Sequence, residues 1–177
     1  TTKNILESKD GDERTIRVQA ILGDIMIEEI FSLIVQPFDE VYPILSSSSF
    51  ENGELMPANF GANNGNVSPD LTIENIPSST ATMILTMRDL DDNNSWHWAV
   101  WNISPDKVSI GQNAVWQGNT IVGNNDFGIG YIGPFPPTEH RYEITVFFLD
   151  DSLDLTADEY GKLLIASTGK VIAQTSL

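Results

Sequence analysis

The chain has 177 residues, which is long enough for one domain with a substantial hydrophobic core. It carries nine Lys and Arg residues against 25 Asp and Glu residues, so its formal net charge is −16, and such a surface repels nucleic acid and anionic membranes. Because the chain has no cysteine, disulfides, thiol nucleophiles and thiolate metal sites are excluded.

The sequence predicts a cytoplasmic protein, since it combines the lack of cysteine with the lack of a recognisable signal peptide. The chain begins at Thr1 rather than at methionine, so a leader or tag removed before this residue would change that expectation. The longest apolar stretch, Val18 to Val35, is interrupted by acidic residues and does not predict a membrane span.

Residues 1–40 are expected to form an extension with an amphipathic helix over Asp12–Gln36. Apolar residues recur there at helical spacing, and Pro37 ends the pattern. The broad apolar face of this helix either docks on the rest of the domain, residues 41–177, or meets a second copy of the chain. The second alternative is a physical reason to expect a homodimer.

Three segments of the remaining chain have the composition or alternation of strands in an antiparallel β-structure: Thr82–Asp89, Trp96–Ile103 and Arg141–Leu149. Near the end, Thr156 and Glu159 form a capping-box pattern that predicts a short helix from Ala157 to about Thr168, stopping at Gly169. Lys170 to Leu177 is compatible with a strand or with more helix.

Asp89 and His97 form the first candidate site, because the predicted strands bring the end of one and the start of the next to the same sheet edge. A neighbouring aspartate fixes the tautomer of a histidine and favours its cation, which binds anions. Two alternatives stay open. The pair closes a loop without any ligand, or Asp89, Asp91 and Asp92 bind calcium.

The second candidate site runs from Gly133 through Pro134 to His140 and Tyr142. Gly133 permits close backbone approach, so its N–H could face a ligand, while the prolines stiffen the wall. His140 and Tyr142 are two residues apart and can point the same way from a strand. The alternatives are a rigid loop corner without a ligand, and a zinc site that uses both histidines with carboxylates. The chain has neither a Gly-x-Ser-x-Gly elbow nor a P-loop.

Taken in order, several segments of the chain resemble the phosphatidylethanolamine-binding protein family, including its bacterial and archaeal Raf-kinase-inhibitor-like branch. The resemblance covers roughly Ile44 to Asp150. It is carried by Ser68-Pro69-Asp70-Leu71, Asp89-Leu90-Asp91, His97-Trp98-Ala99-Val100-Trp101-Asn102-Ile103, Asn125-Asp126-Phe127-Gly128, Tyr131-Ile132-Gly133-Pro134 and His140-Arg141-Tyr142. Leu90 departs from the family, which usually has proline there, and this puts the shape of the pocket in doubt.

The resemblance implies a mainly β fold, a two-sheet antiparallel sandwich with few peripheral helices. It also implies a small anion pocket that takes phosphate or the phosphoryl group of a phospholipid headgroup, with Asp91 and Asp126 as supports. The residues that would line this pocket are Asp89, His97, Gly133, Pro134, His140 and Tyr142.

From both lines of reasoning we expect a binding protein without catalytic turnover, cofactor or metal. The alternatives are a regulatory protein that inhibits a kinase or a serine protease, as members of the family do, and a hydrolase that uses the His/Asp pair as acid and base.

Overall fold

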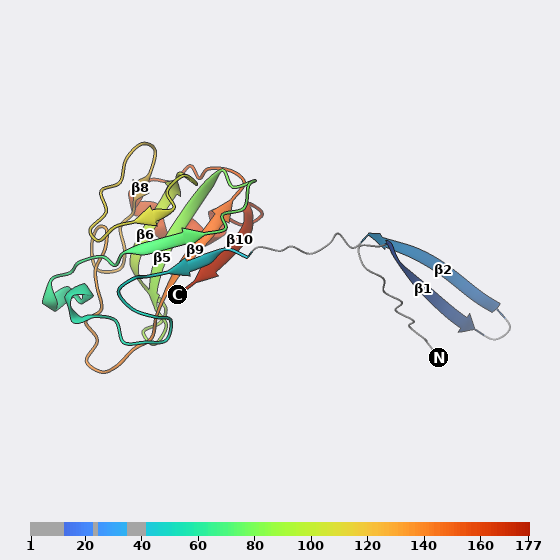
Figure 1. Cartoon of the computed structure of the whole chain (residues 1–177), viewed down its shortest axis with the longest axis horizontal. Coiled ribbons are helices and arrows are strands. Elements are labelled where there is room, and N and C mark those ends of the chain that lie inside the picture. Colours follow the sequence, from blue (N-terminus) through green and yellow to red (C-terminus); the bar gives the residue numbers. More distant parts are fainter. Residues whose placement is uncertain (1–12, 23–24, 35–41) are drawn as a thin grey trace. The chain divides into compact units, whose positions relative to one another are not determined.

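The computed structural model describes residues 13–22, 25–34 and 42–177 (Figure 1). The chain divides into two compact units, Thr1–Val41 and Tyr42–Leu177. The second unit contains both candidate sites, and each unit is described by itself.

The larger unit is built on a five-stranded antiparallel sheet with the strand order β10-β9-β5-β6-β8. Its strands are β5 (Thr82–Asp89), β6 (Ser95–Ile103), β8 (Ile121–Val122), β9 (Tyr142–Leu149) and β10 (Val171–Ser176). The three strands predicted from the sequence are therefore confirmed, and they are the three central strands of this sheet. The segment Lys170 to Leu177, which was compatible with a strand or with more helix, forms strand β10.

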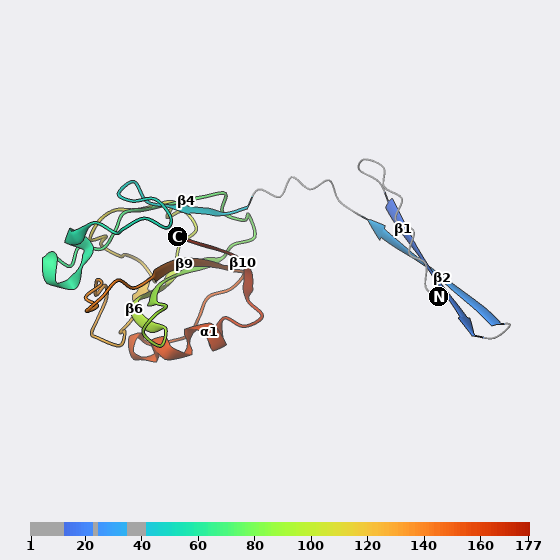
Figure 2. The same cartoon turned by 90° about the horizontal axis from the view of Figure 1, so that it is seen from below.

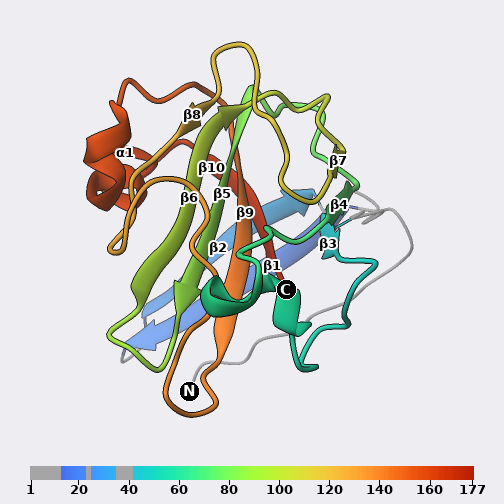
Figure 3. The same ribbon diagram turned by 90° about the vertical axis from the view of Figure 1, so that its left-hand side faces the viewer.

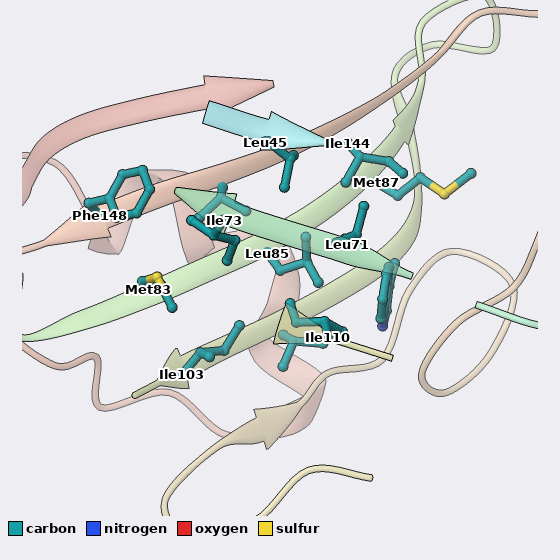
Figure 4. Close-up of a cluster of buried hydrophobic side chains, with 13 residues drawn as sticks. Leu45, Leu71, Ile73, Met83, Leu85, Met87, Ile103, Ile110, Ile144 and Phe148 are labelled. Carbon is teal, nitrogen blue, oxygen red and sulfur yellow. The ribbon is translucent and has the colours of Figure 1, made fainter. Parts of the chain in front are cut away.

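A second antiparallel sheet, in the order β3-β4-β7, covers one face of the first. Its short strands are β3 (Ile44–Ser46), β4 (Leu71–Glu74) and β7 (Ser109–Ile110). Side chains on alternate positions of β5 point toward this second sheet, as strand geometry requires. Figure 4 shows Met83, Leu85 and Met87 meeting Leu71 and other residues of the second sheet in one buried cluster. The two-sheet sandwich is thus confirmed.

The other face of the large sheet is covered by a helical segment near the C-terminus (Figures 2 and 3). Here Ile84, from the alternate positions of β5, packs with Trp101 and with Leu163 of α1 (Leu163–Ala166). The expected helix over 157–168 is shorter and less regular, because a 3-10 helix, Ala157–Lys162, precedes α1. The sequence supplies a reason, since Gly161 weakens a helix interior. Gly169 adopts a positive φ of 80° just beyond the helix, as predicted for its end.

The N-terminal helix predicted over Asp12–Gln36 is wrong. The described residues of this segment form an antiparallel hairpin of β1 (Glu13–Leu22) and β2 (Ile25–Ile34), paired from Glu13 opposite Ile34 to Leu22 opposite Ile25. Apolar residues also recur at every second position from Ile16 to Leu22, and Gly-Asp between two apolar runs is typical of a two-residue hairpin loop. The homodimer prediction therefore loses the helix face on which it was based and stays a prediction.

Removal of residues 1–41 is expected to leave the larger unit folded, because Tyr42–Leu177 is a compact unit with two buried hydrophobic clusters of its own. We expect the midpoint of thermal unfolding to change by less than about 4 °C, the shift that about 1 kcal/mol produces in a domain of this size. Calorimetry of residues 42–177 beside the whole chain tests this. A broad, non-cooperative transition in the shortened chain would contradict it.

Candidate functional site

The two sequence motifs meet at one end of the large sheet. Asp89, the last residue of β5, lies opposite Tyr142 at the start of β9 and opposite Ser95 at the start of β6. Antiparallel pairing therefore brings the end of one strand and the beginnings of its two neighbours together. His97 and His140, far apart in the sequence, approach the same sheet end from β6 and from the loop before β9.

Asp89 pairs with His140 rather than with His97. The Nδ1–H of His140 donates to Asp89 Oδ2 over 2.8 Å, and the carboxylate is buried, with 2% of the residue exposed. The other oxygen, Oδ1, accepts the backbone amides of Asp91 and Asp92, at 2.9 Å and 3.2 Å. The expected loop closure at Asp89 is thus present, but the carboxylate that closes the loop also orients a histidine from the second motif.

The hydrogen bonds around Asp89 fix its charge. Burial alone would raise the pKa of this carboxyl, but hydrogen bonds from His140, Tyr142 and the Asp91 amide outweigh it and hold the pKa below its ordinary value. Burial, together with the hydrogen bond to Asp89, raises the pKa of Tyr142. At neutral pH Asp89 is therefore ionised, and the hydroxyl of Tyr142 stays protonated as a donor to it.

His97 is held by the backbone. Its Nδ1 lies 2.8 Å from the carbonyl oxygen of Ile132, and since a carbonyl only accepts, Nδ1 carries the proton. The ring is buried and meets the edge of Tyr142, with 5.1 Å between ring centroids. Tyr142 thus lies in contact with both His97 and the carboxylate that holds His140, so the two histidines belong to one connected cluster.

The two histidines share a protonation pattern that decides how they meet an anion. Each ring uses its Nδ1–H for a fixed internal hydrogen bond, with Asp89 or with Ile132. In the neutral ring Nε2 is then an acceptor, and it becomes a donor only when the ring is cationic. Each histidine therefore donates to a bound anion only after taking up a proton, or accepts a proton that the anion already carries.

A cavity of about 610 Å³ opens beside this cluster. Of the residues expected to line a pocket, Pro134, His140 and Tyr142 line this cavity, whereas Asp89, His97 and Gly133 do not. Asp89 instead holds a lining residue, His140, in place through a hydrogen bond. The remaining lining residues include Phe50, Glu51, Glu54, Leu55, Met56, Glu139, Arg141, Ile144 and Leu177.

Gly133 serves backbone packing. Its amide, which was expected to face a ligand, donates to Oδ1 of Asn66 over 2.7 Å. A Cβ at this position would lie 1.8 Å from the carbonyl oxygen of Phe60. The glycine is thus needed so that the loop after β8 can approach the 3-10 turn Ala58–Phe60, one wall of the cavity.

Both residues expected to support the site do make structural contacts. Asp91 receives a two-pronged hydrogen bond from the guanidinium of Arg141, at 2.7 Å and 3.1 Å, and also accepts the Arg141 amide. These bonds lower the pKa of Asp91 to about 2. Asp126 accepts the amide of Trp96 over 2.7 Å, next to His97, and the hydroxyl of Tyr160 at the same distance. Each carboxylate therefore fixes the backbone beside one histidine.

Sequence reasoning missed two asparagines. Asn125 is buried, donates to the carbonyls of His97 and Gly130, and accepts the amides of Phe127 and Gly128. Asn66, with a positive φ of 54°, bridges the Gly133 amide and the Tyr131 carbonyl. Asparagine in a glycine-rich turn is a signal for such a role, but it does not show which distant segment the amide will bind.

No group of three or more His, Asp or Glu side chains among the described residues is placed to hold a metal ion. Within the same residues, no helix is both long enough and apolar enough to cross a membrane. The cytoplasmic localisation expected from the sequence stays a prediction.

Comparison with known proteins agrees with this architecture. A family model described as phosphatidylethanolamine-binding protein matches residues 46–177. The chain belongs to this family. It is 32% identical over 146 residues to a UPF0098 protein of Chlamydia trachomatis, covering 75% of this chain and 94% of that protein. The crystal structure of CT736 from Chlamydia trachomatis, described as a homologue of the family, superposes with a TM-score of 0.70 at 28% identity, covering 77% and 94% of the two chains.

The relatives place the chain in the prokaryotic UPF0098 branch of the family. A UPF0098 protein of Archaeoglobus fulgidus is 30% identical over 138 residues, which are 73% of this chain. The chain spans only about half of that relative, 48% of its length. The match to the family model begins at residue 46, so it excludes the hairpin.

Substitution of Gly133 by alanine is expected to destabilise the larger unit by about 1–3 kcal/mol, because the added Cβ overlaps the backbone of Phe60 and forces the wall apart. Gly111→Ala is the matched control, since nothing lies within 4 Å of the position that its Cβ would take. Urea unfolding of both variants measures the difference. Equal stabilities would show that the loop moves without cost.

Substitution of Asp89 by asparagine is expected to lower the free energy of unfolding at pH 7 by about 1–3 kcal/mol, the usual cost of removing a buried charged hydrogen-bond partner. The folded pKa of Asp89 is depressed, so its contribution is complete above the ordinary aspartate pKa of about 3.9 and is lost as pH falls through the folded value. The difference in free energy of unfolding between wild type and variant should therefore become smaller at acidic pH.

Denaturant unfolding at a series of pH values measures that gap. The exposed Asp154→Asn variant is the control, and it should match wild type throughout. A constant gap down to the lowest pH at which both proteins fold would contradict an ionised Asp89.

Proposed function

We propose that the cavity beside His140 binds a phosphoryl-type anion that is part of a larger molecule, with a phospholipid headgroup of the phosphatidylethanolamine kind as the ligand class, and that the protein does not turn this ligand over. The observation that carries the proposal is the position of His140. Its ring lines the cavity while its Nδ1–H is held by an ionised, buried aspartate. This arrangement fixes the tautomer of the ring, so that Nε2 is left for a phosphoryl oxygen, to which it donates when the ring is cationic.

The charges along the cavity favour a zwitterion over a free anion. Three carboxylates, Glu51, Glu54 and Glu139, line it, and the cationic side chains are His140 and Arg141. The guanidinium of Arg141 is already paired with Asp91. A ligand that brings an ammonium group beside its phosphoryl group can satisfy both signs of charge, whereas inorganic phosphate meets mainly acidic surroundings.

The apolar part of the lining supports a ligand with a hydrocarbon portion. Phe50, Leu55, Met56, Ile144 and Leu177 share the cavity with the charged groups. Its volume of about 610 Å³ lies within the usual range for small-molecule sites and exceeds what one phosphate ion fills. These residues can bury the glycerol and the first methylenes of an acyl chain.

Phosphorylethanolamine is expected to bind through His140. The His140→Gln variant should bind about 10- to 100-fold more weakly, as expected for loss of a charged hydrogen bond of about 1.5–3 kcal/mol. Isothermal titration calorimetry of the full chain measures this, with Lys107→Gln as a control that removes a positive charge outside the cavity. Wild-type affinity in the His140 variant would reject the site.

Phosphorus NMR of the same mixtures addresses turnover. A new phosphorus signal that grows with time would contradict a purely binding function. Inhibition of a kinase or a serine protease, which the resemblance implied, stays a prediction.

Binding of a doubly charged phosphoryl group is expected to take up a proton, because Nε2 of His140 donates only in the cationic ring. Because binding takes up a proton, linkage requires the affinity to fall as pH rises. Calorimetry in two buffers of different ionisation enthalpy counts the protons directly. An affinity independent of pH, with no proton uptake, would contradict this coupling.

A further inference from the structure

The side of the cluster that holds His97 is covered by two aromatic rings. Phe127 and Phe135 lie over the imidazole with ring centroids 4.7 Å and 5.8 Å from it, and they touch each other edge to face at 5.0 Å. The two phenylalanines are 41% and 43% exposed, whereas His97 is 2% exposed. The rings thus separate a buried histidine from solvent while remaining half in solvent themselves.

These two rings do not belong to the packing that holds the sheets together. Phe127 and Phe135 belong to neither of the two hydrophobic clusters of the larger unit, and they are not among the partly buried residues packed against those clusters. Half-exposed phenylalanines contribute less to stability than buried ones, because much of their apolar area stays in water. Their position over His97 is therefore better explained by the site than by the core.

Hydrogen bonds and prolines restrict the backbone that carries the two phenylalanine rings. The buried side chain of Asn125 accepts the amide of Phe127 over 2.8 Å and donates to the carbonyl of His97 over 3.1 Å, so it ties the covering residue to the covered one. Phe135 lies between Pro134 and Pro136, whose rings restrict the chain on both sides. Side-chain rotation of the phenylalanines can therefore expose His97 without movement of the loops.

We propose that Phe127 and Phe135 are specificity-determining residues that control access to His97. With the rings in place, the cavity offers His140 alone. His97 becomes available to a phosphoryl-bearing ligand whose apolar portion replaces the contacts of the displaced rings, and inorganic phosphate, which has no such portion, is excluded from it. This inference deepens the proposed function and rests on it for the class of ligand, but the closed state of His97 is a property of the protein without ligand.

The chain has two histidines, so labelling by diethyl pyrocarbonate followed by peptide mass spectrometry reads both sites in one experiment. The side chain of His140 is 18% exposed and serves as the internal reference. We expect His97 to react at least about tenfold more slowly than His140, as for a site that opens in a tenth of the molecules or fewer. Phe127→Ala and Phe135→Ala should each speed labelling of His97 severalfold and leave the rate of His140 unchanged.

Ile129→Ala is the matched control, because Ile129 is in the same loop and is 75% exposed. Equal labelling of both histidines in the wild-type protein, or an equal effect of the Ile129 variant, would overturn the proposal. If a Phe→Ala variant unfolds, both histidines become reactive together, and the Phe127→Leu and Phe135→Leu variants, which keep apolar bulk, then decide the matter by the same ratio of rates.

Imidazole NMR during titration with inorganic phosphate tests the discrimination. At the high phosphate concentrations that the acidic lining of the cavity requires, we expect the signals of His140 to shift in the wild-type protein and those of both histidines to shift in the Phe127→Ala/Phe135→Ala variant. A shift of His97 in the wild-type protein would overturn the inference. If phosphorylethanolamine shifts neither histidine in any variant, the proposed function is rejected. The labelling rates without ligand would still report whether Phe127 and Phe135 shield His97.

Discussion

The buried carboxylate of Asp89 is the interaction on which the arrangement of the site depends. It terminates the central strand β5, accepts two amides of the loop that follows, and holds the Nδ1–H of His140 and the hydroxyl of Tyr142. An ionised group that is 2% exposed is tolerated only where its hydrogen-bonding capacity is filled. The same bonds that offset its desolvation therefore also fix the ring of His140, so one residue sets both the stability and the geometry of the candidate site.

The sequence predicted those parts of the fold that repeat along the chain. Alternate residues of β5 and β9 pack in the two buried clusters on opposite faces of the sheet, and both strands were predicted within one residue of their observed ends. The helix predicted in the N-terminal segment was wrong because the apolar residues there are dense enough to fit both a helical period and the two-residue period of a strand. The deciding signal, a Gly-Asp pair between two runs of equal length, is local turn chemistry rather than periodicity.

The candidate site was predictable as a set of residues but not as a set of contacts. Spacing favoured a pair of Asp89 with His97, which are eight residues apart, whereas the carboxylate meets His140, which is 51 residues away. Asp89 lies opposite both Ser95 and Tyr142, each of which is two residues from a histidine, but the Nδ1–H of His97 is taken by the carbonyl of Ile132 and that of His140 is left for Asp89. Long-range pairing of this kind depends on how whole strands align. The amide of Gly133 was misassigned for the same reason, since its partner Asn66 is on a distant turn.

The proposed site for a phosphoryl group, in a chain of net charge −16, must overcome both the distant field and a carboxylate in direct contact with His140. The ionised Asp89 offsets the charge of a cationic His140 ring, so the pair presents a directed N–H donor with almost no net charge. A donor of this kind gains little from long-range attraction and depends on short-range geometry and on the rest of the ligand. Glu51, Glu54 and Glu139 then become an advantage, because they repel free anions while they attract the ammonium end of a zwitterion. The acidity of the chain and the proposed phosphoryl site are therefore compatible when the ligand carries both charges.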